Sequence, residues 1–162
     1  MPQRRSRQQS TFSHPDVRSG TTLTSVTDPV SVVESYLYAV MRDKDFDVVR
    51  SLLADDVVYE NVGYPSMRGV DRIVSVFRRL DTPKVRFDVV IHRIARDGTT
   101  VLTERTDSVL IGTFEAHFWV CGVFEVRDGR ITLWRDYFDL SDLIKGVARG
   151  MAGVVLPALR RK

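Results

Sequence analysis

The hydrophobic pattern of this 162-residue chain changes its period at Lys84. Before Lys84 apolar residues recur at helical spacing, and after it they alternate with polar residues as in half-buried strands. Strands are expected from Lys84 and at 101–111, 114–126 and 130–138, with turn signals at Asp97-Gly98, Gly112-Thr113 and Asp128-Gly129 between them. Helices followed by an antiparallel meander predict an α+β domain, in which a curved sheet wraps around the N-terminal helices.

The segment before Lys84 predicts three helices and one short strand. The first helix begins at Asp28-Pro29, with Asp as N-cap and Pro at the first helical position, and is expected to end near Arg42. Asp45 caps the second helix, and a strand follows at 57–61. The inward positions are predicted to be Phe46, Val49 and Leu53 on the second helix, Val57, Tyr59 and Asn61 on the strand, and Val70, Ile73, Phe77 and Leu80 on the third helix.

Residues 1–27 differ in composition from the rest of the chain. They hold four arginines and one aspartate, so they carry the whole net charge of +3, and residues 28–162 are neutral. This segment has almost no apolar periodicity, and we expect a disordered basic tail at 1–27 followed by a single domain at 28–162. A neutral domain is not expected to bind nucleic acid.

Cysteine content and hydropathy bear on the cellular compartment. The single Cys121 has no partner for an internal disulfide, and no apolar run reaches the ~18 residues of a membrane span. Arg4-Arg5 is not followed by the apolar stretch of an export signal. We expect a cytoplasmic protein with no membrane span.

Charged residues lie on the inward face of the strand at 101–111. Arg105 and Asp107 alternate with solvent-facing residues and share their face with Val101, Thr103, Val109 and Ile111. Burying a charge costs several kcal/mol unless it is paired. For an isolated Arg-x-Asp, the simplest interpretation is a structural ion pair.

Strand register brings a second acid to the same place. If Gly112-Thr113 is a two-residue loop, Arg105 lies opposite Val120 and Asp107 opposite Phe118. For the next hairpin, a two-residue loop would place Asp136 opposite Cys121, on the outer face. We favour a three-residue loop at 127–129, which places Asp136 opposite Val120 and matches large with small side chains.

This register predicts two carboxylates, Asp107 and Asp136, bridged by Arg105. The surrounding pocket is expected to be lined by Phe118, Val120, Trp134 and Phe138. A buried triad that only stabilises the fold is the structural alternative. Two acids at one cation leave excess negative charge, however, so one acid keeps its proton, and an acid facing a base suits general acid–base catalysis.

Three short segments resemble the limonene-1,2-epoxide hydrolase family: Tyr59-x-Asn61, Arg105-x-Asp107 and 134–139, Trp-Arg-Asp-Tyr-Phe-Asp. The resemblance runs from about residue 28 to the C-terminal helix, and the actinobacterial branch that acts on lipid and steroid epoxides looks closest. It implies a homodimer with a cone-shaped fold like nuclear transport factor two (cystatin-like), in which helices pack in a strongly curved mixed sheet. It also implies lipid metabolism, with no metal and no other cofactor.

The resemblance further implies a one-step reaction that converts a lipophilic epoxide and water to a vicinal diol. Asp136 would be the base that deprotonates the water, and Tyr59 and Asn61 would hold that water. Asp107, kept protonated, would donate to the oxirane oxygen, and Arg105 would bridge the two acids.

Other residues and activities were weighed against this interpretation. His92 and His117 lie on the solvent-facing side and form no metal-binding pattern, while Trp119, Cys121 and Val123 make an outward apolar strip that suits a dimer surface. A helix from 139 onward, with Leu143, Ile144, Val147 and Met151 at helical spacing, is expected to cover the pocket mouth or a partner. The same fold also suits a steroid or polyketide isomerase or cyclase, or a non-catalytic dimer that binds a hydrophobic ligand.

Overall fold

The computed structural model describes residues 28–138, 141, 144–145, 147–148 and 151. Its elements are α1 (Pro29–Tyr38), η1 (Ala39–Asp43), α2 (Phe46–Leu52), β1 (Leu53–Asn61), β2 (Met67–Arg68), α3 (Val70–Leu80), β3 (Val85–Asp97), β4 (Thr100–Ile111), β5 (Phe114–Arg127) and β6 (Arg130–Phe138). One six-stranded sheet has the order β2-β1-β6-β5-β4-β3. Only β1 and β6 pair in parallel, so the predicted α+β class with a curved mixed sheet is confirmed.

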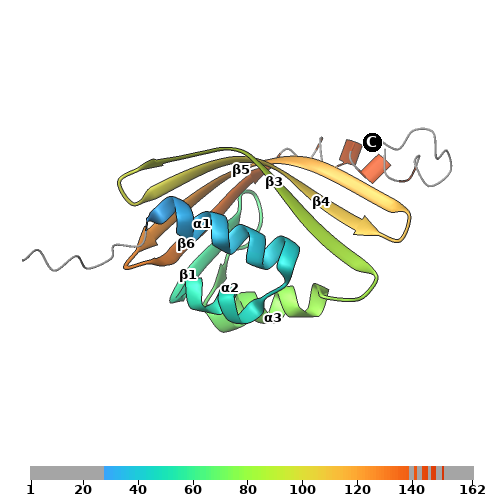
Figure 1. Cartoon of the computed structure of the whole chain (residues 1–162). Helices are drawn as coiled ribbons and strands as arrows, with labels where there is room; N and C mark the ends of the chain where they lie inside the picture. The colour runs from blue at the N-terminus through green and yellow to red at the C-terminus, as the bar shows by residue number, and fades with distance from the viewer. Residues whose placement is uncertain (1–27, 139–140, 142–143, 146, 149–150, 152–162) are drawn as a thin grey trace, which may run out of the picture.

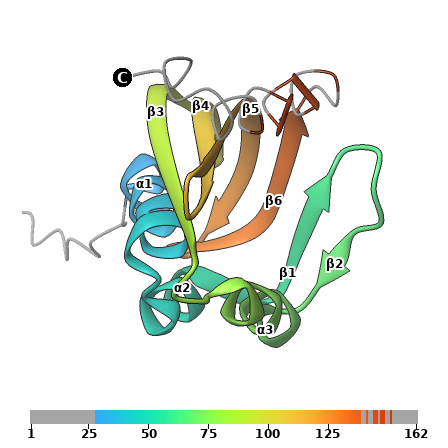
Figure 2. The same ribbon diagram turned by 90° about the vertical axis from the view of Figure 1, so that its right-hand side faces the viewer.

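The sheet arches over α1, α2 and α3, which lie on its concave side (Figure 1). In the rotated view, α2 and α3 lie at one end of the arch, and β3 to β6 rise away from them (Figure 2). The core between the layers is built from apolar side chains of α1, α2, α3 and the inward positions of the strands. Its fully buried members include Val33, Val49, Val57, Ile73, Val89, Val101, Phe124 and Ile131.

Both predicted helix starts are confirmed. The Asp28 carboxylate accepts from Ser31 N at 3.3 Å with Pro29 in the first turn, and Asp45 accepts from Val48 N at 3.1 Å. After Tyr38 the first helix widens into the π-helical turn η1, which ends at Lys44 in a left-handed conformation (φ 56°). Met41 of η1 lines the cavity described below.

Several predicted positions differ in the structure. Leu53 is fully buried as predicted, but it begins β1 instead of ending the second helix. The short strand β2 was not predicted, because two residues carry no period. Leu80 and Ile111, predicted to face the core, are 46% and 45% exposed because they lie at the ends of α3 and β4.

The register between β4 and β5 is as predicted. Gly112 and Thr113 form a two-residue loop, so Ile111 pairs with Phe114, Arg105 with Val120 and Asp107 with Phe118. Gly112 has a positive φ of 59°, as a tight hairpin turn requires. The short loop therefore fixes which β5 residues the charged pair meets.

The predicted register between β5 and β6 is wrong. The loop is the two-residue turn Asp128-Gly129, with φ values of 51° and 75°, and a bulge at Thr132 follows. Asp136 consequently pairs with Gly122 instead of Val120, and Trp134 pairs with Phe124. The bulge has a physical reason: Ile131 and Trp134 are both buried, and residues an odd number apart share a face only when an extra residue intervenes.

The predicted tail at 1–27 lies outside the described residues, as does Leu143 of the predicted C-terminal helix. The described residues between 141 and 151 have helical conformation. Ile144 and Met151 among them are 60% and 62% exposed. Across the described part of the chain, no helix has the length and apolar character needed to cross a membrane.

Candidate active site

The candidate site is organised around the side chain of Arg105, the largest fully buried side chain among the described residues. Nε and Nη2 donate to the two carboxylate oxygens of Asp107 at 2.9 and 3.2 Å. Nη2 also donates to Oδ2 of Asp136 at 2.7 Å, and Nη1 donates to Thr103 Oγ1 at 3.3 Å. One guanidinium therefore bridges two carboxylates, which are only 5% and 4% exposed.

Arg105 reaches Asp136 by crossing the intervening strand β5. Arg105 pairs with Val120, whereas Asp136 pairs with Gly122, so the guanidinium passes diagonally over Gly122. A Cβ atom on Gly122 would lie 2.4 Å from Arg105 Nη1 and 2.6 Å from Thr103 Oγ1. Gly122 was not predicted as a site residue, although a glycine inside a strand is a signal of close approach by another group.

Burial and charge set the proton affinities of the two acids. Burial raises the pKa of Asp136 above its usual value, against the lowering effect of Arg105, and the charge of Asp107 raises it further. The pKa of Asp107 is also raised by burial and lowered in part by Arg105. Burial lowers the pKa of Arg105, but both carboxylates outweigh it, so the guanidinium stays charged. The site therefore favours retention of a proton on the acid pair.

Tyr59 and Asn61 lie beside this pair on β1. The parallel pairing of β1 and β6 places Asn61 opposite Asp136 and Tyr59 opposite Trp134. Asn61 Nδ2 donates to Tyr59 Oη at 2.8 Å, and the Tyr59 ring stacks on Trp134 with centroids 3.9 Å apart. Burial raises the pKa of Tyr59, so its hydroxyl stays protonated.

A cavity of about 200 Å³ opens onto the acids. It is lined by Met41, Tyr59, Asn61, Phe77, Phe87, Asp107, Val109, Phe118, Val120, Trp134, Asp136 and Phe138. The predicted pocket and polar residues are thus brought together, with Arg105 behind the wall. Four further lining residues were not predicted: Met41, Phe77, Phe87 and Val109. Sheet alternation could have indicated Phe87 and Val109, which pair with each other on β3 and β4.

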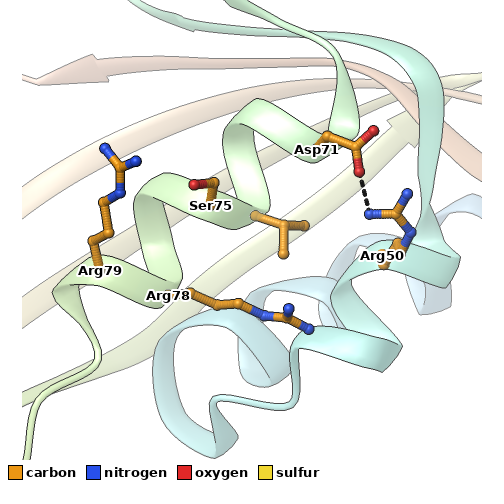
Figure 3. Close-up of a pocket in the computed structure, with 6 residues that line it drawn as sticks. Arg50, Asp71, Ser75, Arg78 and Arg79 are labelled. Atoms are coloured by element: carbon orange, nitrogen blue, oxygen red, sulfur yellow. Dashed lines mark hydrogen bonds and ion pairs between the residues drawn. The ribbon is translucent and has the colours of Figure 1, made fainter.

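A second hollow, of about 300 Å³, lies on the outer side of α2 and α3 (Figure 3). It is lined by Arg50, Asp71, Val74, Ser75, Arg78 and Arg79. Arg50 pairs with Asp71 and Arg78 with Asp47, and the arginine side chains are about half exposed. This hollow is larger, but its charged side chains are exposed to solvent, so the buried acids make the smaller cavity the candidate site.

His92, His117 and Cys121 lie away from the acids. His92 bonds to Thr106 Oγ1 at 2.9 Å, and His117 Nδ1 to Ser108 Oγ at 2.7 Å. Cys121 is partly buried and unbridged. Within the described residues, no group of three or more His, Cys, Asp and Glu side chains is arranged to hold a metal ion.

The family of the chain follows from comparison with known proteins. Residues 27–149 match the model of the limonene-1,2-epoxide hydrolase catalytic domain. The chain belongs to the limonene-1,2-epoxide hydrolase family. The resemblance inferred from the three short polar segments is therefore confirmed for most of the chain.

Individual members of the limonene-1,2-epoxide hydrolase family are close relatives. The chain is 54% identical over 128 residues to epoxide hydrolase EphG of Mycobacterium tuberculosis. The aligned region covers 79% of this chain and 85% of that protein. A solved structure of an LEH-like epoxide hydrolase from M. tuberculosis matches with a TM-score of 0.76 and 52% identity, covering 82% of this chain and 98% of that one.

A more distant match extends the fold beyond the family. A protein from Catenulispora acidiphila with a ketosteroid isomerase-like fold matches with a TM-score of 0.63 and 21% identity, over 72% of this chain and 92% of that one. At this identity the match concerns the fold alone.

Gly122→Ala tests the crossing of Arg105 over β5. The added methyl group must displace the guanidinium or Thr103, both of which lie within 2.6 Å of the Cβ position. We expect at least a tenfold loss of kcat at 25 °C, equivalent to about 1.4 kcal/mol. Gly98→Ala strains a hairpin turn with φ 59° but places no atom close to another residue, so it is the control for general destabilisation and should keep its kcat. Unchanged activity of Gly122→Ala would contradict the crossing.

Arg105→Gln tests the charge balance of the site. Removing one partner of a buried ion pair costs about 3–5 kcal/mol, and here it leaves two carboxylates without a cation. Without Arg105 the folded-state pKa values of both acids rise further above their unfolded values. Protonation then favours the folded state. The loss in free energy of unfolding relative to wild type should therefore be large at neutral pH and smaller at acidic pH.

The measurement is urea unfolding of wild type and Arg105→Gln at neutral and mildly acidic pH. Arg93→Gln is the matched control, because Arg93 pairs with Glu104 on the exposed face. Its deficit should not follow the same pH dependence. A deficit of Arg105→Gln that is equal at both pH values would show that the acids do not depend on this guanidinium.

Proposed function

We propose that this protein hydrolyses a lipophilic epoxide to a vicinal diol in one step, without a covalent enzyme intermediate. The observation that carries the proposal is the buried acid pair bridged by Arg105 at the wall of an apolar cavity. Membership of the family and the close epoxide hydrolase relatives support the reaction type. Two aspartate side chains with raised pKa values can supply a general acid and a general base within one site.

In this mechanism Asp136 is the base. Its Oδ2 accepts from Arg105, and its buried Oδ1 has no hydrogen-bond partner among the described residues. Asn61 and Tyr59, on the neighbouring strand, hold the water through amide and hydroxyl groups. Both are neutral, so they orient the water without competing for its proton.

Asp107 is the acid that opens the ring. As the water oxygen bonds to a ring carbon, Asp136 takes the water proton, the carbon–oxygen bond breaks, and Asp107 gives its proton to the leaving oxygen. The products are the diol, a protonated Asp136 and an ionised Asp107, and the proton returns to Asp107 before the next turnover. Arg105 keeps one negative charge on the pair in each state.

The lining of the cavity supports a lipophilic substrate. Phe77, Phe87, Phe118, Trp134 and Phe138 supply aromatic surface, and no Lys, Arg or His is among the described residues that line the cavity. Water is scarce in such a site, which strengthens the bonds to the developing charges. The proposed place of the enzyme is lipid metabolism in the cytoplasm.

The first test is a single-turnover reaction in water enriched in heavy oxygen, with a panel of terpene, fatty-acid and steroid epoxides. We expect the label in the diol at the first turnover, because the attacking oxygen comes from water. Asp136→Asn and Asp107→Asn should each lower the rate by about 10²–10⁴ while remaining folded.

Asp55→Asn, a change of an exposed aspartate on β1, is the matched control and should keep the wild-type rate. Label appearing only after the first turnover would indicate a covalent intermediate. Turnover of none of the epoxides by the native protein would favour an isomerase, cyclase or binding role.

We also propose a homodimer formed through the outer face of the sheet. Val90, Leu102, Trp119 and Tyr137 are 41–49% exposed on this face. Val90 and Trp119 flank Thr106 on a single rung across β3, β4 and β5. Exposed apolar side chains clustered in this way mark interaction surfaces.

Sedimentation velocity tests the dimer. The native protein should sediment as a dimer, and Trp119→Arg should shift it toward monomer, because a charge would be buried in the contact. The control is Val48→Arg, which changes an exposed apolar residue on α2, away from the sheet face, and should leave the dimer intact. A native monomer, or a Trp119→Arg dimer, would contradict this surface.

A further inference from the structure

Three buried side-chain polar atoms form no hydrogen bond among the described residues: Tyr36 Oη, Trp134 Nε1 and Asp136 Oδ1. Trp134 and Asp136 belong to the cavity wall, but Tyr36 comes from α1 and has no part in the mechanism above. An unsatisfied buried polar group costs about 1–3 kcal/mol, and nearly all such groups find a partner. Asp136 and Trp134 lie two residues apart on β6, and the Tyr36 ring packs against Trp134, so the three atoms call for a common explanation.

Tyr36 lies behind the cavity wall. It is fully buried, and its ring packs edge-on against Trp134 and Phe124, with centroid distances of 5.2 and 6.5 Å. Burial raises the pKa of Tyr36 most, Tyr59 and Asp136 raise it further, and Arg105 lowers it. The hydroxyl is therefore a protonated donor within electrostatic reach of Asp136 and Arg105.

The three atoms complement one another chemically. Tyr36 Oη–H and Trp134 Nε1–H are donors, and Oδ1 of an ionised Asp136 accepts. Trp134 precedes Asp136 by two residues on β6, so both face the same side. Burial raises the pKa of Asp136, and Arg105 lowers it. The indole of Trp134 lies close enough to lower this pKa slightly as well, although it makes no direct hydrogen bond. A water needs two to four polar partners, and these atoms supply three.

We propose that Tyr36 is a positioning residue of the reaction, whose hydroxyl, together with Trp134 Nε1, holds Oδ1 of Asp136 through one bound water. The proposal rests on the proposed function, because it concerns the base of that reaction. Arg105 fixes Oδ2 and the Tyr36 hydroxyl fixes Oδ1, so the carboxylate keeps one orientation toward the substrate water.

The same contact influences the charge of the base. The groups that face Asp136 are Arg105 and Asp107 from β4, Tyr59 and Asn61 from β1, and Tyr36 from α1. Hydrogen bonds donated to a carboxylate favour its ionised form, so loss of the Tyr36 hydroxyl raises the pKa of Asp136. The acidic limb of the pH–rate profile then moves to higher pH, because the reaction requires an ionised base.

Tyr36→Phe removes the hydroxyl and keeps the ring packing. We expect kcat to fall about tenfold, equivalent to about 1.4 kcal/mol, with little change in KM. We also expect the acidic limb to move up by about half to one pH unit. The matched control is Tyr38→Phe on the same helix, where the ring packs under the Arg42 guanidinium at 4.9 Å; it should leave kcat and the limb unchanged.

A carbon-13 NMR titration of aspartate carboxyl groups gives a readout that does not depend on activity. The Asp136 resonance, assigned with Asp136→Asn, should titrate at higher pH in Tyr36→Phe than in wild type. A wild-type kcat in Tyr36→Phe would overturn the role of Tyr36. So would a loss of activity without any shift of the acidic limb of the pH–rate profile or of the Asp136 titration. If Asp136→Asn itself remains active, the proposed function fails instead, whatever Tyr36→Phe does.

Discussion

The bridging of two buried carboxylates by Arg105 is the interaction on which the rest of the site depends. A guanidinium in an apolar interior is costly unless its donors are used, and here four hydrogen bonds reach Asp107, Asp136 and Thr103. The fold provides for this in two ways. Alternation along β4 aligns three of the residues, and Gly122 leaves the space through which the side chain crosses β5.

The charge imbalance at this bridge connects structure to chemistry. Two acids share one cation in a site where burial raises the pKa of each, so the pair is suited to hold one proton and one negative charge. Tyr59 and Asn61 add neutral polar groups beside the pair, and Tyr36 adds a further hydroxyl behind it. Aromatic side chains complete the wall and keep the interactions strong by limiting solvent.

Prediction from the sequence was accurate for the β4–β5 hairpin, where a tight turn decides the outcome. The Gly112-Thr113 turn fixes the β4–β5 register, so the positions of Arg105 and Asp107 followed from it. Asp136 was assigned to the correct face through the wrong loop, because the bulge at Thr132 depends on burying both Ile131 and Trp134. Neither the place of Met41 in the cavity wall nor the packing of Tyr36 against Trp134 could be predicted, because helix packing on the sheet decides both and both residues match an ordinary core pattern.

Infrared difference spectroscopy reports directly whether one of the two acids holds a proton, because a protonated carboxyl group has a C=O stretching band that a carboxylate lacks. We expect such a band in the native protein at neutral pH, and its loss in Asp107→Asn. Asp88→Asn, which changes a half-exposed aspartate paired with Arg42, should leave the band in place. Absence of the band from the native protein would mean that both acids are ionised, and would contradict the division of the pair into an acid and a base.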